Sequence, residues 1–172
     1  MTQSEDFEVR LAAAERAIEV LQGEAQVPGG ASMVPTDDAL WALEGLRVRA
    51  PEGGAVLYVG SVDLPNGGTV RWQYGLGAAA VFAQDWTEQA LALAALGNPV
   101  RLQILHAVLH GTTTVAALVE VLDSGTSGQV YHHLKELTTA GWLVSGKRGV
   151  YEVPGARVVP LLAILVAAGT PG

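Results

Sequence analysis

The sequence predicts an α+β protein that is mainly helical, and three observations support this class. The second half contains several apolar segments with helical spacing, each preceded by a residue suited to an N-cap. The first half contains two β-rich runs, Ala55 to Val62 and Thr69 to Tyr74, separated by the turn sequence Leu64 to Gly68. The N-terminal stretch from Ser4 to Gln22 has the apolar spacing of an amphipathic helix. A chain of 172 residues can form one domain with a buried core or two small domains.

The composition excludes several kinds of site. The chain contains no cysteine, which excludes a disulfide framework, a zinc site with thiolate ligands, an iron–sulfur cluster and a cysteine nucleophile. The sequence supports no acid–base pair and no Ser-His-Asp group, so we expect neither an enzyme nor a cofactor. The longest apolar run, Val158 to Gly169, is well short of the ~20 residues that cross a bilayer, and the N-terminus is polar and acidic. These features predict a cytoplasmic protein.

Charge is distributed unevenly along the chain. The net charge is −7, from 17 acidic and 10 basic residues. Residues 1–85 contain twelve acids and five bases, whereas residues 86–172 contain five of each. A second half without net charge can still bind the phosphate backbone of DNA locally, if its basic side chains lie at the positions that face the DNA. The acidic balance therefore does not exclude DNA binding.

The N-terminal residues 1–22 are predicted to form an amphipathic dimerisation helix. Apolar residues recur at alternating spacings of four and three, which is the pattern of a seam between two helices. The residues expected at this dimer interface are Phe7, Leu11, Ile18 and Leu21. The alternative is that the same stripe packs on its own domain. Residues 23–35, rich in glycine and proline, are predicted to be a flexible linker.

Residues 36–84 are predicted to form a small α+β unit. Thr36 is the expected N-cap of a short helix over Asp37 to Gly45, and the two β-rich runs form a hairpin. Leu46 to Arg49 and Ala79 to Phe82 are the candidates for further strands.

Most of the aromatic residues lie in or beside this hairpin unit. They are Trp41, Tyr58, Trp72, Tyr74, Phe82 and Trp86. They fill the core of a small sheet, or they form a ligand pocket or partner surface that controls the rest of the chain. In the second interpretation this unit receives a small-molecule or protein effector.

Two capped helices begin the second half of the chain. The sequence Asp85-Trp86-Thr87-Glu88 resembles a capping box and starts a helix that runs to Leu96, with Gly97 as its C-terminal stop. Asn98-Pro99 fits the N-cap and first position of the next helix, which ends at Gly111.

The following two helices are predicted to form a helix-turn-helix. Thr114 caps a helix that runs to Leu122, and Asp123-Ser124-Gly125 forms a tight turn. Thr126-Ser127-Gly128-Gln129 is a second capping box, which starts a helix to Ala140. Two helices joined by a short turn with glycine are typical of this motif.

A wing and a C-terminal helix complete residues 85–172. Trp142 to Val144 and Val150 to Val153 are short strands around the basic turn Ser145 to Gly149. Val158 to Ala168 is a helix that is apolar on nearly every side, so we expect a second chain to cover it. The contacts expected at this interface are Leu161, Leu162 and Leu165. The predicted fold is a winged helix-turn-helix with an N-terminal amphipathic helix and a small β-hairpin unit.

The stretch from Ala94 to Val153 resembles the ArsR-type winged-helix repressors. The similarity lies in Ala94 to Leu105, in Val130 to Leu137, and in Ala140 to Val144 with the wing that follows. The resemblance implies a homodimer that reads an operator in consecutive major grooves of double-stranded DNA and releases it when an effector binds. Metal-sensing members use a Cys box on the helix before the turn, or Asp and His on the last helix. Neither set is present here, so the resemblance implies no metal site.

The helix over residues 126–140 is predicted to read DNA. Val130, Leu134 and Leu137 fall on one side as core, whereas polar residues fall on the other, and His133 at the edge is expected to be structural. The residues expected to contact bases or phosphates are Thr126, Ser127, Gly128, Gln129, Tyr131, His132 and Lys135, with Lys147 and Arg148 on the wing and Arg101 as a phosphate clamp. The alternative function is a winged-helix scaffold that binds a protein partner instead of DNA.

His106 and His110 are the remaining candidate ligands. Their i, i+4 spacing places both imidazoles on one side of a helix, which suits two ligands of one metal ion. The sequence shows no third ligand nearby. Histidines in the last turn of a helix also interact favourably with the helix dipole, which explains the pair without a metal.

Overall fold

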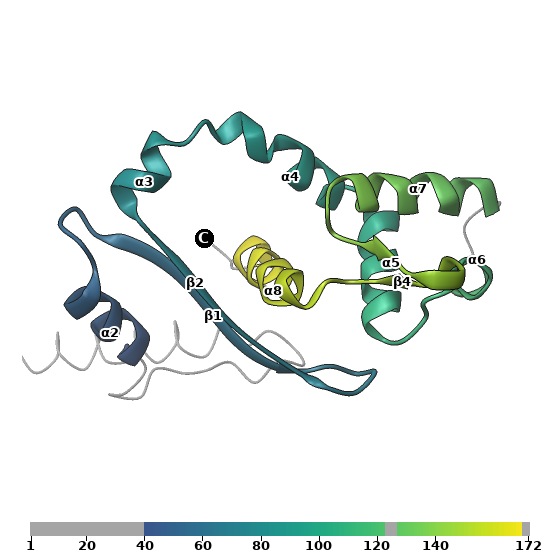
Figure 1. Ribbon diagram of the computed structural model, residues 1–172, viewed down its shortest axis with the longest axis horizontal. Helices are drawn as coiled ribbons and strands as arrows, with labels where there is room; N and C mark the ends of the chain where they lie inside the picture. The colour runs from purple at the N-terminus through teal and green to yellow at the C-terminus, as the bar shows by residue number, and fades with distance from the viewer. Residues whose placement is uncertain (1–39, 123–126, 170–172) are drawn as a thin grey trace, which may run out of the picture. The chain divides into compact units, whose positions relative to one another are not determined.

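The computed structural model describes residues 40–122 and 127–169. The chain divides into two compact units, Met1–Val48 and Arg49–Gly172. The predicted dimerisation helix, the linker of residues 23–35 and the N-cap Thr36 lie outside the described residues. The described residues are mainly helical with two small antiparallel sheets (Figure 1), which confirms the predicted fold class.

Helix α2 (Trp41–Arg49) forms the described end of the first unit. The predicted strand over Leu46–Arg49 is wrong, because these residues continue the helix. The Nε atom of Arg47 donates to Glu44 Oε2 at 3.1 Å, an ion pair one helical turn apart that supports the helix. Within the described residues, no partner strand pairs with this segment.

Strands β1 (Ala55–Asp63) and β2 (Thr69–Gly77) form the predicted antiparallel hairpin. Gly67 and Gly68 in the turn have φ angles of 93° and 89°, which glycine adopts without strain. The N–H of Leu64 donates to the carbonyl oxygen of Gly68 at 2.9 Å and closes the turn. Both strands are confirmed, and β2 extends beyond its predicted end.

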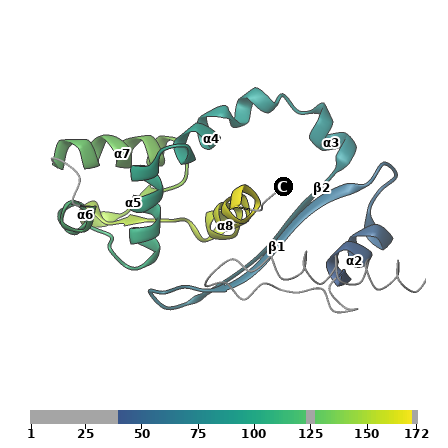
Figure 2. The ribbon, with the colours of Figure 1, turned by 180° about the vertical axis from the view of Figure 1, so that it is seen from behind.

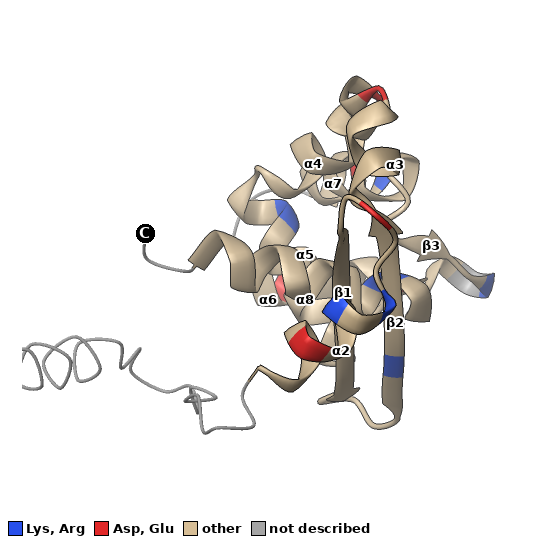
Figure 3. Cartoon of the chain, turned by 90° about the vertical axis from the view of Figure 1, so that its left-hand side faces the viewer, with Lys and Arg blue, Asp and Glu red and all other residues tan. Residues whose placement is uncertain are grey.

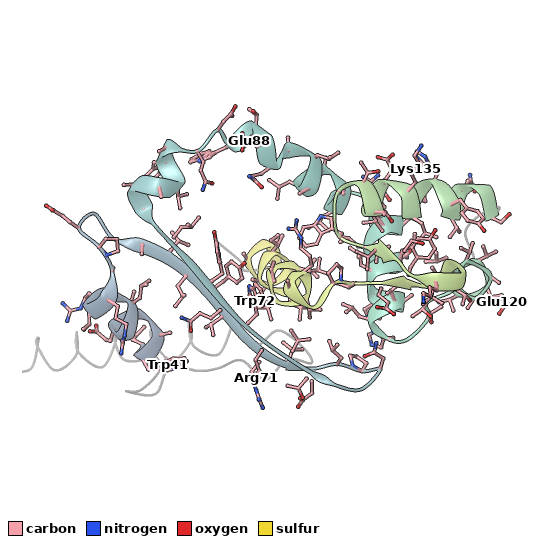
Figure 4. The ribbon with its side chains drawn as sticks, viewed as in Figure 1. Trp41, Arg71, Trp72, Glu88, Glu120 and Lys135 are labelled. Carbon is pink, nitrogen blue, oxygen red and sulfur yellow. The ribbon has the colours of Figure 1, made fainter. Side chains whose placement is uncertain are left out.

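One side of the hairpin is apolar and packs against helix α8 (Gly155–Gly169). This side carries Val56, Tyr58, Gly60 and Val62 from β1, and Val70, Trp72, Tyr74 and Leu76 from β2. Gly60 pairs with Trp72 and lies against Val159 of α8. Figure 4 shows Trp72 on the side of the hairpin that faces α8. The hairpin that was expected in a separate unit of residues 36–84 therefore lies in the same compact unit as α8.

Helix α3 (Ala78–Ala83) replaces the strand predicted over Ala79–Phe82. Alanine has the highest helix propensity, and no neighbouring strand pairs with this segment in the described part of the chain. Phe82 is exposed and its ring lies 6.3 Å from that of Trp86. The prediction that the aromatic residues of this region fill a core does not hold for these two side chains.

After α3, five further helices in the described residues lead to the wing. They are the 3-10 helix η1 (Trp86–Gln89), α4 (Ala90–Leu96), α5 (Pro99–Leu109), α6 (Val115–Leu122) and α7 (Ser127–Thr139). Asp85 accepts a hydrogen bond from the Thr87 N–H at 2.9 Å, and Asn98 Oδ1 accepts from the Val100 N–H at 3.0 Å. These bonds satisfy N–H groups that have no partner within the helix. The predicted caps at Asp85 and Asn98 are confirmed.

The hydrophobic core lies among α4, α5, α6 and α7. Its largest fully buried side chains include Ile104, Leu105, Leu118, Leu134, Leu137 and Trp142. The indole Nε1–H of Trp142 donates to the carbonyl oxygen of Ala92 at 2.8 Å. Trp142 was predicted to begin a wing strand, but it belongs to the core because it is 2% exposed.

The wing consists of β3 (Val144–Ser145), the tip η2 (Lys147–Gly149) and β4 (Tyr151–Glu152). The two strands are antiparallel and shorter than predicted. The N–H of Tyr151 donates to the carbonyl oxygen of Thr113 at 2.8 Å, which attaches the wing to the segment before α6. Residues 85–122 and 127–169 therefore contain the helices and the two-stranded wing predicted for a winged helix-turn-helix.

Helix α8 begins at Gly155, before the predicted start at Val158, and contains Pro160. Its apolar character was expected to require a second chain. Val158 and Val159 are nevertheless buried within this chain, and Leu161 is part of the main core. No single helix in residues 40–122 and 127–169 has the length and apolar composition to cross a membrane. The bent pair Trp86–Leu96 and Pro99–Leu109, at 77°, meets both criteria only when taken together.

Candidate nucleic-acid interface

Helix α7 has one buried and one exposed side. Val130, Leu134 and Leu137 are buried and hold the helix in the core. The exposed residues on its outer side include Ser127, Gly128, Gln129, Tyr131, His132 and Lys135. Figure 4 shows Lys135 pointing away from the body of the domain. Thr126, the first predicted contact, lies outside the described residues.

A shallow groove of about 380 Å³ runs between α7 and the wing. Its lining residues are Tyr131, Lys135, Thr138, Thr139, Ser145 and Tyr151. Only Tyr131 and Lys135 were predicted as contacts. Thr138 and Thr139 lie three and four residues after Lys135, so helical spacing could have identified them. Ser145 and Tyr151 depend on how the wing packs, and no local sequence pattern reveals that.

Basic side chains lie at both ends of this surface. Lys135 is exposed on α7 and Lys147 is exposed at the tip of the wing. Figure 3 shows the basic end of the wing projecting beyond β3. The same two elements also carry acidic residues, Glu136 on α7 and Glu152 on β4. Arg148 is part of the wing tip, but the structure does not describe its side chain.

The structure corrects the role expected for Arg101. Its Nε–H donates to the carbonyl oxygen of Ala95 at 2.7 Å, and its Nη2 donates to that of Ala94 at 2.8 Å. These carbonyls end α4, where helical carbonyls lack partners within the helix. Arg101 is therefore engaged in joining α4 to α5, and it is not placed as a phosphate clamp. The sequence did not reveal this because the partners lie on another helix.

His133 is partly buried at the edge of α7, and its Nδ1 atom has no hydrogen-bond partner among the described residues. Burial lowers the pKa of His133, and the nearby His132 and Arg101 lower it further. All three effects disfavour the charged ring. A neutral, partly buried ring fits the structural role expected from the sequence.

His106 and His110 are both exposed near the end of α5. Their ring centroids are 4.0 Å apart, and the rings are tilted by 31°. The Nδ1 atom of His110 lies 2.8 Å from the carbonyl oxygen of His106. In residues 40–122 and 127–169, no group of three His, Asp or Glu side chains is arranged to hold a metal ion.

Residues 96–143 match the family model described as a helix-turn-helix domain. The match covers less than half of the chain and extends from the end of α4 to the residue before β3. No curated protein matches the chain. The α6–α7 pair and the family match together define the class of the domain, a helix-turn-helix typical of DNA-binding regulators.

Proposed function

We propose that this protein is a sequence-specific DNA-binding transcription regulator that inserts α7 into the major groove. The observation that carries this proposal is the exposed polar side of α7, held in place by the buried Leu134 and Leu137. Amide and imidazole groups, such as those of Gln129 and His132, can hydrogen-bond base edges. Lys135 and Lys147 supply charges for the phosphate backbone.

The proposed regulator acts as a homodimer of ArsR type. Leu161 is buried in the core of its own chain, so the proposed contact through α8 rests on Leu162 and Leu165. Leu165 is 41% exposed and apolar, which supports a contact with a second copy. The N-terminal residues 1–22 add a second seam in this proposal. Dimers of this motif bind half-sites about one helical turn apart, roughly 34–36 Å along the DNA.

In this proposal the protein is a repressor that works at the nucleoid in the cytoplasm. Its input is a small molecule or a protein rather than a metal ion, because the chain has no cysteine and α8 carries neither Asp nor His. In this proposal the regulator releases DNA when the effector binds. A protein of this kind needs no catalytic group.

A second candidate function is a winged-helix scaffold that binds a protein. The acidic residues Glu136 on α7 and Glu152 on β4 favour it, because negative charge on the two elements that would meet DNA weakens attraction to phosphate. The net charge of −7 acts in the same direction.

Fluorescence anisotropy with DNA from upstream of the protein's own gene separates the two candidates. Labelled duplex is titrated with the full chain in the presence of excess unlabelled duplex of shuffled sequence. Binding that survives this competitor supports the regulator. Binding that the competitor removes completely, or no binding at all, contradicts it and favours the scaffold.

A further inference from the structure

A groove of about 640 Å³ is lined by residues that are not among those proposed above to contact DNA. Figures 1 and 2 show α5 between α6 and α8, and the groove is lined by residues of all three helices. This volume is within the range of small-molecule sites, about 300–1,000 Å³. The aromatic residues of the hairpin unit are one candidate site for the effector, and this groove is another.

The two walls of the groove differ in chemistry. Gln103, His106 and His110 form a polar stripe along α5, at spacings of three and four residues. Val121 and Leu122 at the end of α6, together with Leu165 on α8, form an apolar wall. No lysine, arginine, aspartate or glutamate lines the groove in the described part of the chain. A ligand that fits both walls is uncharged, mostly apolar, and carries a polar group on one edge.

The hydrogen bond of His110 determines which polar group fits. A carbonyl oxygen only accepts, so the Nδ1 atom of His110 must donate its proton to the His106 carbonyl oxygen, 2.8 Å away. In a neutral imidazole the other nitrogen is then an acceptor. His110 Nε2 is therefore a hydrogen-bond acceptor, and a ligand with a donor such as a hydroxyl group can bond to it. The His106 and His110 rings lie against each other, with centroids 4.0 Å apart and planes tilted by 31°, and this pair gives the polar wall an aromatic character that suits an aromatic ligand.

We propose that this groove binds a neutral aromatic compound that carries a hydroxyl group, a phenol of one or two rings, and that this compound is the effector. The regulatory part rests on the proposed function. Helix α6 ends at Leu122 in the groove wall, and α7 begins at Ser127, five positions further along the chain. A ligand that contacts Val121 and Leu122 favours one position of α6, and thereby changes the affinity of α7 for DNA.

Isothermal titration calorimetry without DNA tests the site, with 2-naphthol and naphthalene as the two probes. All titrations use the same buffer at one pH. We expect saturable binding of 2-naphthol by the full chain. His110→Phe retains a flat ring but removes the acceptor, so it should weaken 2-naphthol binding about tenfold and leave naphthalene binding unchanged. Equal effects on both probes, or no saturable binding of 2-naphthol, overturn the proposal.

Val121→Asp tests the apolar wall. Val121 is exposed, so a carboxylate there leaves the core intact, but it should abolish binding of both probes. The matched control is Val48→Asp on α2, another exposed valine, which should bind both probes normally. Leu165 belongs both to this groove and to the proposed contact between copies of α8, so the oligomeric state of Val121→Asp is measured by analytical ultracentrifugation. A changed oligomeric state would show that a second copy occupies the groove, and would overturn the ligand proposal.

The regulatory part is measured separately, as the DNA affinity with and without 2-naphthol. Weaker DNA binding in the presence of 2-naphthol, but no change for His110→Phe at the same concentration, supports an effector. If 2-naphthol does not change the DNA affinity of the wild-type chain, the regulatory part is overturned. The calorimetric result then still shows whether the groove binds the ligand. If the chain binds no DNA, the proposed function is contradicted but the proposed ligand site is not, because the calorimetry is done without DNA.

Discussion

Val159 on α8 lies so close to Gly60 on β1 that a Cβ atom on Gly60 would be 2.7 Å from the Val159 Cγ1 atom. Only a residue without a side chain allows the hairpin and α8 to approach so closely. The hairpin thereby covers Val159, which is 3% exposed. The hairpin is therefore part of the structure that supports the winged helix.

Gly60→Ala is expected to destabilise the chain by about 1–3 kcal/mol, because the added methyl group overpacks this contact. Urea unfolding followed by circular dichroism measures the change. Gly155→Ala is the matched control, since a Cβ there meets no atom within 4 Å. Equal stability of the two variants would show that the hairpin does not pack tightly on α8.

Trp142→Phe is expected to lower the free energy of unfolding by about 0.5–1.5 kcal/mol, because it removes the hydrogen bond to the Ala92 carbonyl. The guanidinium of Arg157 lies 5.1 Å from the Trp142 ring centre and would also lose part of its interaction. Trp86→Phe removes a similar bond, to the Val81 carbonyl, at an exposed site. Denaturant unfolding of both variants should show the larger loss for Trp142→Phe, and the reverse order would contradict the assignment of Trp142 to the core.

The stability of the fold should fall as the pH is lowered through about 6.5, the usual pKa of histidine. Partial burial, and then His132 and Arg101, lower the pKa of His133 in the folded state, so the unfolded chain binds more protons in this range. Urea midpoints at about pH 7.5 and about pH 5.5 measure the effect. His133→Gln should reduce the pH dependence more than His110→Gln does. A pH dependence unchanged in His133→Gln would be evidence against this assignment.

Leu165→Glu is expected to convert a dimer to monomer, because it places a charge in the proposed contact between copies of α8. Analytical ultracentrifugation measures the mass. The matched control is Val59→Glu on the polar side of the hairpin. Val59 is 48% exposed and Leu165 is 41% exposed, so the two substitutions place a charge at sites of similar exposure. If Leu165→Glu sediments as a dimer like the wild-type chain, the interface lies elsewhere.

Much of the fold could be predicted because its signals are local. Asp85 and Asn98 cap helices with bonds to residues two or three positions ahead, and Gly67 and Gly68 set the hairpin turn. The exposed side of α7 followed from helical spacing in the same way. The strand predicted over Ala79–Phe82 failed because a strand needs a partner, and the sequence does not say whether one is present.

The parts that could not be predicted depend on contacts between distant segments. Arg101 was expected to bind phosphate, but it bonds the carbonyls that end α4. The cover over Val159 comes from a hairpin that lies far earlier in the chain, and no periodicity in α8 distinguishes such a cover from a second chain. Ser145 and Tyr151 join the proposed DNA surface only through the packing of the wing.

The salt dependence of DNA binding by Lys135→Ala tests the assignment of α7 most directly. Affinities for the upstream duplex are measured at several salt concentrations for the wild-type chain, Lys135→Ala, Gln129→Ala and His132→Ala. Arg71→Ala on β2 is the control for loss of one exposed positive charge, and Figure 4 places Arg71 far from Lys135.

We expect Lys135→Ala to weaken binding to all sequences and to reduce the salt slope by about one, because one phosphate contact is lost. Gln129→Ala and His132→Ala should cost about 1–3 kcal/mol at particular base pairs, and Arg71→Ala should match the wild-type chain. Affinities and salt slopes that are the same for all four variants and the wild-type chain would contradict the central claim that α7 reads DNA.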